Sequence, residues 1–259
     1  MIWGFSTLGC PELSLPEAAA LADRFGFPHL ELRTVSGSLN LPEVLRRPVN
    51  RTVLRQLADA GRVRILGTSF GLAGSQTGDR EELAAFAALA DEFNIPYLRV
   101  FGGFPFESGL GENRLRLAAA NLDWWRRQCC RCQLALETHD GFSSAARVRQ
   151  LFDALGEELP VIWDVHHTFS VGGETPAASF ALIGRTTVDV HVKDAVHLPD
   201  GGQKAVLPGD GELPVPATLA LLEAEKYAGD VTLEYEKQWQ PYLPPLPEAL
   251  TAVNRCWKK

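Results

Sequence analysis

The stretch Val188-Asp189-Val190-His191-Val192-Lys193-Asp194 decides how the rest of the chain is interpreted. Valine alternates in it with Asp, His and Lys, which predicts a β-strand with one apolar face and one ionisable face. In a (β/α)8 barrel the catalytic side chains lie at the carboxyl ends of the strands. We therefore expect His191 and Lys193 to point into one cavity, provided that other strands end in the same way.

The rest of the sequence alternates strand patterns with helix patterns. Strands are expected at residues 2–7, 29–33, 63–69, 97–101, 133–138, 160–164, 187–193 and 230–236. Helices follow them; Ser14 is a candidate N-cap of the first and Gly26 closes it. Regular alternation of strand and helix predicts a parallel sheet, and eight repeats predict that the sheet closes. We therefore expect an α/β fold, a single (β/α)8 TIM-barrel domain over residues 1–259. An open doubly wound sheet is disfavoured because no Gly-rich phosphate turn opens the first helix.

Composition restricts the class of protein. The chain has 259 residues, 46% of them hydrophobic and 22% charged, which suits one globular domain of this size. A net charge of −7 without any basic run argues against nucleic acid as a partner. The N-terminal residues do not resemble a signal peptide, and no apolar run approaches about 18 residues, so we expect a cytoplasmic protein with no membrane partner.

The cysteines predict a reducing compartment and no metal site. There are five, Cys10, Cys129, Cys130, Cys132 and Cys256, an odd number without a secretion signal. Three of them lie within four residues, but the second pair that zinc sites of such spacing use is missing. We interpret these three as small apolar residues at the end of a helix expected over 112–131.

Each of the four C-terminal strands ends in a side chain that can bind a metal ion. These side chains are Glu137, Asp164, His191 and Glu234, and each lies on the face opposite the apolar residues of its strand. Three carboxylates and one imidazole in one cavity need a compensating cation. An oxygen-rich set with one imidazole suits a single Mn²⁺, Co²⁺ or Mg²⁺ ion, and Zn²⁺ also fits. The alternative is four separate polar residues at a solvated rim.

Around these residues the sequence resembles the xylose isomerase-like TIM-barrel superfamily, in its sugar phosphate isomerase/epimerase branch. The resemblance rests on Leu136-Glu137-Thr138-His139, Asp164-x-x-His167, His191-Val-Lys-Asp194, the Gly209-Asp-Gly211 turn and Leu233-Glu-Tyr-Glu-Lys237. These motifs cover the C-terminal half of the chain. The N-terminal half matches more loosely, through Gly26 and Glu31-Leu32-Arg33.

The resemblance implies roles for these residues. Glu137, Asp164, His191 and Glu234 would hold the metal, which binds a substrate hydroxyl and a neighbouring carbonyl and stabilises the enediolate formed between them. Glu137 and Glu234 would also remove and return the proton. The expected substrate-binding residues are His167, Lys193, Arg33, Arg99 and His139. For the two arginines, which lie on the polar faces of their strands, a buried ion pair is the alternative.

The expected function is isomerisation or epimerisation of a small sugar, sugar phosphate or keto-polyol. A carbohydrate-like small molecule is therefore the expected partner, and homo-oligomerisation stays open. The first alternative is a metal-dependent dehydratase of the inosose or dehydroshikimate type on the same residues. A metal-free glycoside hydrolase with paired carboxylates and a non-catalytic sugar-binding barrel are the others. Ketose 3-epimerases of this superfamily tend to have Arg six residues beyond the strand-seven His, where this chain has His197.

Overall fold

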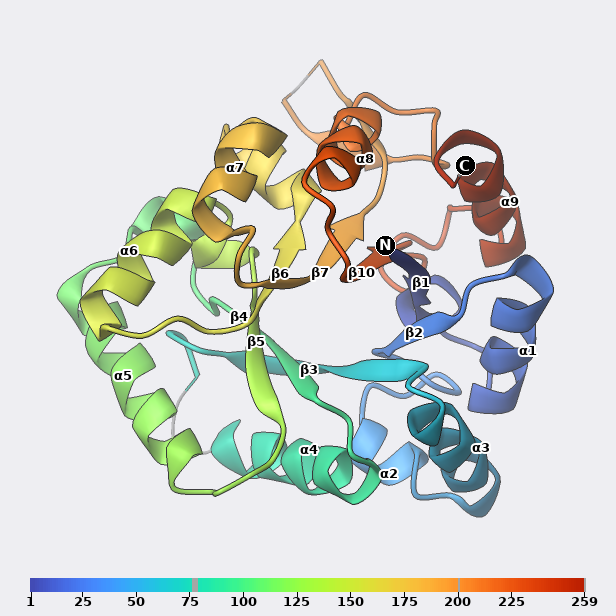
Figure 1. The fold of residues 1–259 in the computed structure, drawn as a ribbon, viewed down its shortest axis with the longest axis horizontal. Coiled ribbons are helices and arrows are strands. Elements are labelled where there is room, and N and C mark those ends of the chain that lie inside the picture. The colour runs from blue at the N-terminus through green and yellow to red at the C-terminus, as the bar shows by residue number, and fades with distance from the viewer. Residues whose placement is uncertain (76–78, 200, 259) are drawn as a thin grey trace. The chain divides into compact units, whose positions relative to one another are not determined.

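The computed structural model describes residues 1–75, 79–199 and 201–258. Eight parallel strands form a closed barrel in the order β1-β10-β7-β6-β5-β4-β3-β2, and helices alternate with them along the chain (Figure 1). This order confirms the predicted (β/α)8 fold class.

The strands and helices lie close to the expected ranges. The barrel strands are β1 (Ile2–Ser6), β2 (His29–Leu32), β3 (Val63–Gly71), β4 (Tyr97–Phe101), β5 (Gln133–Glu137), β6 (Val161–Asp164), β7 (Thr187–Val192) and β10 (Asp230–Leu233). The α-helices are α1 (Leu15–Phe25), α2 (Leu41–Val44), α3 (Pro48–Asp59), α4 (Asp79–Phe93), α5 (Glu112–Arg126), α6 (Ala145–Leu155), α7 (Pro176–Ile183), α8 (Val215–Ala224) and α9 (Leu246–Cys256). Short helical turns are η1 (Thr7–Gly9), η2 (Phe106–Ser108), η3 (Asp140–Phe142) and the π-helix η4 (His167–Val171).

Two short strands were not expected from the sequence. The Gly/Pro-rich segment after β7 contains β8 (Ala195–His197) and β9 (Gln203–Ala205), which pair antiparallel outside the barrel. The last barrel strand was expected over residues 230–236, but β10 stops at Leu233. Glu234 therefore follows the strand instead of lying within it.

The chain divides into two compact units. Met1–Val63 and Val190–Lys259 make up the first, and Arg64–Asp189 makes up the second. The expectation of a single domain over 1–259 therefore stays a prediction, and the units are described separately below.

In the first unit, β1 pairs in parallel with both β2 and β10. Gly4 lies opposite His29 on one side and Thr232 on the other. A Cβ added at Gly4 would lie 2.5 Å from Cδ2 of His29, so this position of the strand needs glycine. The pairing brings the start of the chain beside the strand that ends at Leu233.

Helix α1 begins and ends as its sequence predicts. The Ser14 backbone N–H donates to Oε2 of Glu17 at 2.8 Å as part of a capping box, and the Ser14 hydroxyl donates to the same oxygen at 2.6 Å. Gly26 ends the helix in the left-handed conformation, with φ of 72°. The helix contacts α3 and α9, and its buried residues are Leu15, Ala18, Ala19 and Ala22.

In the second unit, β3, β4, β5 and β6 pair in parallel in sequence order. Ile65, Ala135 and Ile162 form a buried apolar cluster against which Tyr97 packs. Because side chains alternate along a strand, Ala135 and Glu137 share one face of β5. On β5, the apolar cluster therefore lies two residues before the polar side chain of Glu137 at the strand end.

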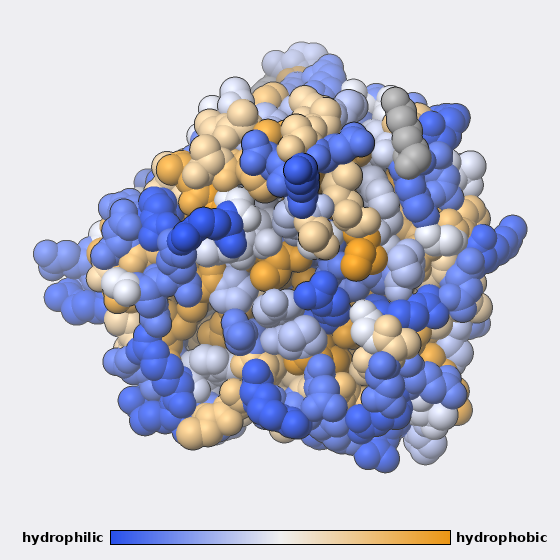
Figure 2. All heavy atoms as spheres, viewed as in Figure 1, coloured by the Kyte–Doolittle hydropathy of each residue, from blue (hydrophilic) through white to orange (hydrophobic). Residues whose placement is uncertain are grey.

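Hydrophilic side chains cover much of the face drawn in Figure 2, with smaller apolar areas between them. Within the described ranges, no helix is both long and apolar enough to cross a membrane.

Candidate metal and substrate site

In the first unit, the carboxyl end of β7 presents His191 to two glutamates. The His191 ring is fully buried, with Nε2 2.7 Å from Oε2 of Glu31 and Nδ1 3.7 Å from Oε1 of Glu234. The Ser6 hydroxyl donates to the other oxygen of Glu31 at 3.0 Å. When Nε2 donates its proton to Glu31, Nδ1 presents a lone pair towards Glu234. A carboxylate behind an imidazole is the arrangement that orients metal-binding histidines.

Lys193, two residues after His191, also binds Glu234. Its Nζ lies 2.6 Å from Oε2 of Glu234 and 3.1 Å from Oε1 of Glu236, and only 7% of the residue is exposed. The two oxygens of Glu234 therefore have different neighbours, the ammonium on one side and the imidazole on the other. A solvated rim position for Lys193 is excluded by its burial.

Arg33 lies directly after β2, two residues beyond Glu31 on the same face. It is 7% exposed, and its backbone N–H donates to Oγ1 of Thr7 at 2.9 Å. The structure thus buries Arg33 at the strand end where the sequence analysis expects it.

In the second unit, Glu137 ends β5 and binds Arg99 of β4. Glu137 is fully buried; Nε of Arg99 donates to its Oε2 at 2.6 Å, and a terminal guanidinium nitrogen forms an ion pair with the same oxygen. Arg99 also donates to the carbonyl of Thr68 at 3.3 Å. Arg99 is thus part of a buried ion pair, and its expected contact with substrate stays a prediction. The guanidinium compensates the charge that burial would otherwise penalise.

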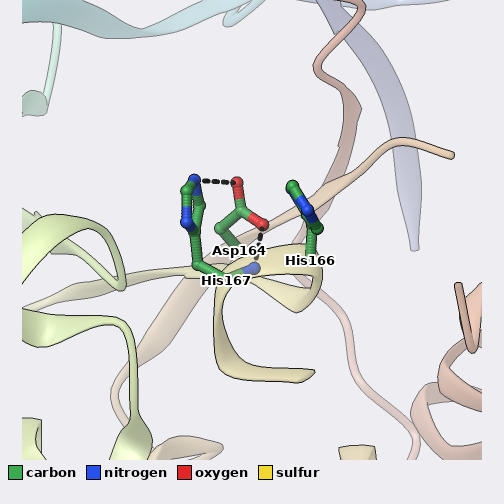
Figure 3. A group of neighbouring side chains, drawn as sticks. All are labelled: Asp164, His166 and His167. Carbon is green, nitrogen blue, oxygen red and sulfur yellow. Dashed lines mark hydrogen bonds and ion pairs between the residues drawn. The ribbon is translucent and has the colours of Figure 1, made fainter. Parts of the chain in front are cut away.

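Asp164 ends β6, and the chain then turns so that two histidines flank its carboxylate (Figure 3). Oδ1 accepts the backbone N–H of His167 at 3.1 Å, and Oδ2 lies 3.8 Å from Nε2 of the His167 ring. Asp164, His166 and His167 each offer one ligand atom, and these atoms lie within 4.8 Å of one another. Sequence reasoning missed His166, although its place beside the Asp164-x-x-His167 motif was a usable signal.

His139 lies beside His167. The two ring centroids are 4.2 Å apart, and Nδ1 of His139 is 2.8 Å from Oδ1 of Asp140. Burial lowers the pKa of His139, but the Asp140 hydrogen bond and the charge of Glu137 outweigh it, so this pKa is raised overall. The second unit therefore gathers Arg99, Glu137, His139, Asp164, His166 and His167 near the ends of three consecutive strands.

Asp194 holds the loop that follows β7. Its carboxylate accepts backbone N–H groups from Ala195, Gly209, Gly211 and Leu213, at 3.1, 2.9, 3.0 and 3.3 Å. A Cβ added at Gly211 would lie 2.1 Å from Oδ1 of Asp194, so only glycine fits there. The Gly209-Asp-Gly211 motif thus supplies two of the backbone N–H groups that bind the Asp194 carboxylate.

His197 lies in the antiparallel pair of strands within this loop. Its Nδ1 is 2.8 Å from Oε2 of Glu212 and its Nε2 is 3.0 Å from Nε2 of Gln203. Both ring nitrogens therefore contact side chains of the loop itself.

The three clustered cysteines lie after helix α5. The helix expected over 112–131 ends at Arg126, so Cys129, Cys130 and Cys132 lie after it; Cys129 has a φ of 53°, which ends regular helix. Among the described residues, no metal-capable group of side chains contains a cysteine. Burial, with the charge of Asp91 and a neighbouring thiol, raises the pKa of Cys132 to about 12, so its thiol stays protonated at neutral pH.

Comparison with known proteins identifies the family. Residues 17–257 match the family described as xylose isomerase-like TIM barrel, so the chain belongs to this family, as its motifs predict. No curated protein matches the chain.

Solved structures share the fold. An IolI protein with a bound zinc atom superposes with a TM-score of 0.75 at 16% identity, over 98% of this chain and 96% of that one. The probable 3-DHS dehydratase AsbF from Bacillus anthracis gives 0.75 at 15% identity, over 98% and 99%. A D-allulose 3-epimerase from Methylomonas sp., in complex with D-allulose, gives 0.70 at 14%, over 98% and 94%. At these identities the likeness is one of fold.

Proposed function

We propose that this protein is a divalent-metal-dependent isomerase or epimerase of a small sugar, sugar phosphate or keto-polyol. Glu137, Asp164, His191 and Glu234 are the proposed ligands of one metal ion. The strands concerned, β5, β6, β7 and β10, are neighbours in the barrel order, and each ligand lies at or next to the carboxyl end of its strand. Fold relatives described as zinc-bound and as an epimerase support this choice of class.

The observation that most supports a metal is the spacing of His191 and Glu234. At 3.7 Å, the Nδ1–Oε1 distance is too long for a hydrogen bond. Two ligands that each lie about 2.1 Å from one ion are at most about 4.2 Å apart. The pair therefore has the spacing of two ligands of one ion, and Glu31 turns the imidazole accordingly. The donor set suits Mn²⁺, Co²⁺, Mg²⁺ or Zn²⁺.

The chain's own residues supply the proton transfers. A divalent ion held by these ligands would supply Lewis acidity, which lowers the pKa of a C–H bond next to a carbonyl group. Glu234 removes that proton, and Lys193 holds its second oxygen in place at 2.6 Å. In an isomerisation Glu234 gives the same proton back to the neighbouring carbon. In an epimerisation Glu137, fixed by Arg99, gives a proton to the opposite face, and exchange with solvent then restores both carboxyl groups to their starting protonation states. His139, His167, Lys193, Arg33 and Arg99 are proposed to bind the substrate's oxygens, with the two histidines in ring contact.

Dehydration is the second candidate on the same residues. Removal of the same proton leads to loss of water when a hydroxyl group lies one carbon further along the substrate. A fold relative described as a probable 3-DHS dehydratase favours keeping this reaction in the substrate screen.

Metal content tests the proposal directly. We expect plasma mass spectrometry of protein purified without chelator to find about one Mn, Co, Mg or Zn per chain, and less in His191→Ala and Glu234→Gln. Glu225→Gln, an exposed glutamate after α8, is the matched control. Full occupancy in both site variants, or no ion after soaking with Mn²⁺, overturns the metal assignment and returns the hydrolase and binding functions to consideration.

Turnover then tests the acid–base pair. After a screen of ketoses and keto-inositols, Glu137→Gln and Glu234→Gln should each abolish activity while circular dichroism shows an unchanged fold. Activity within about tenfold of wild type in either variant contradicts the assigned role. Activity that resists chelator points to the metal-free hydrolase.

A further inference from the structure

A cavity of about 570 Å³ lies at the amino end of β1, within the first unit. It is lined by residues of β1, of α8 and of the end of α9, which lie near the N-terminus in Figure 1. Its volume is within the usual range of small-molecule sites, about 300–1,000 Å³. Ser6, which contacts Glu31, is at the other end of β1, so the cavity is separate from the candidate metal ligands of this unit.

Two tryptophans and two leucines give this cavity apolar walls. Trp3 is 8% exposed and Trp257 is 7% exposed. The Trp3 ring packs edge-on against Phe27, with centroids 6.5 Å apart at an angle of 84°. Leu222 is fully buried and Leu219 half-buried. These side chains suit a ligand with a flat apolar body.

The indole N–H groups of the two tryptophans have no hydrogen-bond acceptor among the described residues. Trp163, by contrast, donates to Oγ1 of Thr168 at 2.9 Å. A buried indole N–H normally has a partner, because an unmade hydrogen bond of a buried group is costly. Neither nitrogen is among the unpaired polar atoms that the structure seals from solvent. A ligand in the cavity can therefore supply the acceptor.

Lys226 adds a cation to the wall of the cavity. It follows α8 with a φ of 54°, a left-handed conformation that favours glycine and strains a residue with a side chain. Within the described part of the chain, its ammonium group has no ion-pair partner. Glu223 also lines the cavity, but the ammonium and the two indole N–H groups together outnumber its carboxylate. The donors therefore favour a ligand that carries an anionic acceptor.

We propose that this cavity binds a small organic acid with a flat apolar body. The body lies against Trp3, Leu222 and Trp257, and the carboxylate provides acceptors for Lys226 and for the indole N–H groups. The ligand contacts segments from both ends of the chain, so its binding stabilises the first unit by mass action. This inference does not rest on the proposed function.

The probe is naphthalene-2-carboxylate, and its cationic counterpart with the same rings is 2-naphthylmethylamine. The chain has six tryptophans, whose indole N–H signals are resolved in proton–nitrogen NMR spectra and assigned with Trp→Phe variants. We expect the Trp3 and Trp257 signals to shift and saturate with the acid, in protein with and without bound metal. Trp239, which is 50% exposed and does not line the cavity, should stay in place. The amine should bind at least about fivefold more weakly.

Variants of the charged wall residues test the choice of an acid. Lys226→Gly removes the cation and suits the left-handed backbone, so the fold should be at least as stable in thermal unfolding. It should weaken binding of the acid by about two- to fivefold. Lys204→Gln, at an exposed lysine of β9, is the control and should not change the affinity. Glu223→Gln should strengthen binding by about two- to fivefold, because a like charge is removed.

The possible contrary results are distinct. Equal affinity for acid and amine, or for wild type and Lys226→Gly, overturns the choice of an organic acid. Shifts confined to Trp239, or no shift at all, overturn the site. A Trp257 signal that moves with protein concentration alone shows that a second copy of the chain occupies the cavity, which also overturns the inference. His191→Ala should bind the acid as tightly as wild type; loss of binding in that variant places the probe at the metal ligands and leaves the proposed function standing.

Discussion

Glu31 and His191 share a buried hydrogen bond of 2.7 Å between Oε2 and Nε2, although 160 residues of chain separate them. The bond determines which ring nitrogen faces Glu234. In the proposed metal site, Glu31 would therefore act as a positioning residue through the imidazole.

Glu31→Gln should weaken metal binding. An amide cannot supply the negative charge that increases the basicity of the imidazole, and such partners typically contribute about 10–100-fold in metal affinity. Titration of metal-free protein with Co²⁺ or Zn²⁺ measures the change, beside Glu225→Gln. Equal affinity in the two variants would show that Glu31 does not orient His191.

Arg99→Leu should destabilise the second unit. It leaves the buried carboxylate of Glu137 without its guanidinium partner, and loss of one member of a buried pair typically costs about 3–5 kcal/mol in the free energy of unfolding. Urea unfolding followed by circular dichroism measures this. The double variant Arg99→Leu/Glu137→Leu should lose less than the sum of the single variants, because no uncompensated charge remains; strict additivity would contradict the coupling.

Asp194→Asn should loosen the loop after β7. The amide retains one acceptor oxygen, so one pair of N–H donors loses its acceptor: Gly209 and Gly211 at Oδ2, or Ala195 and Leu213 at Oδ1. We expect a loss of about 1–3 kcal/mol, and faster proteolysis within residues 195–214. Asp210→Asn, an exposed residue of the same turn, should leave both measurements unchanged.

Ser14→Ala should raise the pKa of Glu17, which lies in the first turn of α1. The Ser14 side-chain and backbone hydrogen bonds lower the pKa of Glu17. A lowered carboxylate pKa stabilises the fold above the unfolded-state value, and the contribution disappears as pH falls through the folded-state value. NMR titration of Glu17 should show its pKa rising towards the ordinary value of a glutamate in the variant. An unchanged titration would mean that the capping box does not form in solution.

The sequence predicts the fold because strand patterns and helix caps are local. Valine alternation over 188–192 and the Ser14–Glu17 capping box each depend on residues within one turn or strand, and both elements form as expected. Strand-end residues such as Glu137 follow from the same alternation, since β5 ends at that residue.

The features that the sequence did not predict depend on contacts between residues that are far apart in the chain. The partner of Glu31 could not be predicted, because its bond to His191 joins strands that are far apart in the sequence. The Arg99–Glu137 ion pair was only one of two alternatives for Arg99, because the sequence does not give the distance between side chains of neighbouring strands. The β8–β9 pair escaped notice because each strand has three residues inside a Gly/Pro-rich segment.

The pairing of β1 with β10 also governs when the first unit can form during synthesis. Residues Arg64–Asp189 are one continuous stretch, so the second unit can begin to fold while the ribosome is still adding the C-terminal segment. The first unit needs both ends of the chain, because Ile2 lies opposite Asp230. Its long-range closure is entropically costly and slow. A nascent chain that ends before β10 therefore contains Glu31 and His191 but lacks Glu234 and the strand that completes their surroundings.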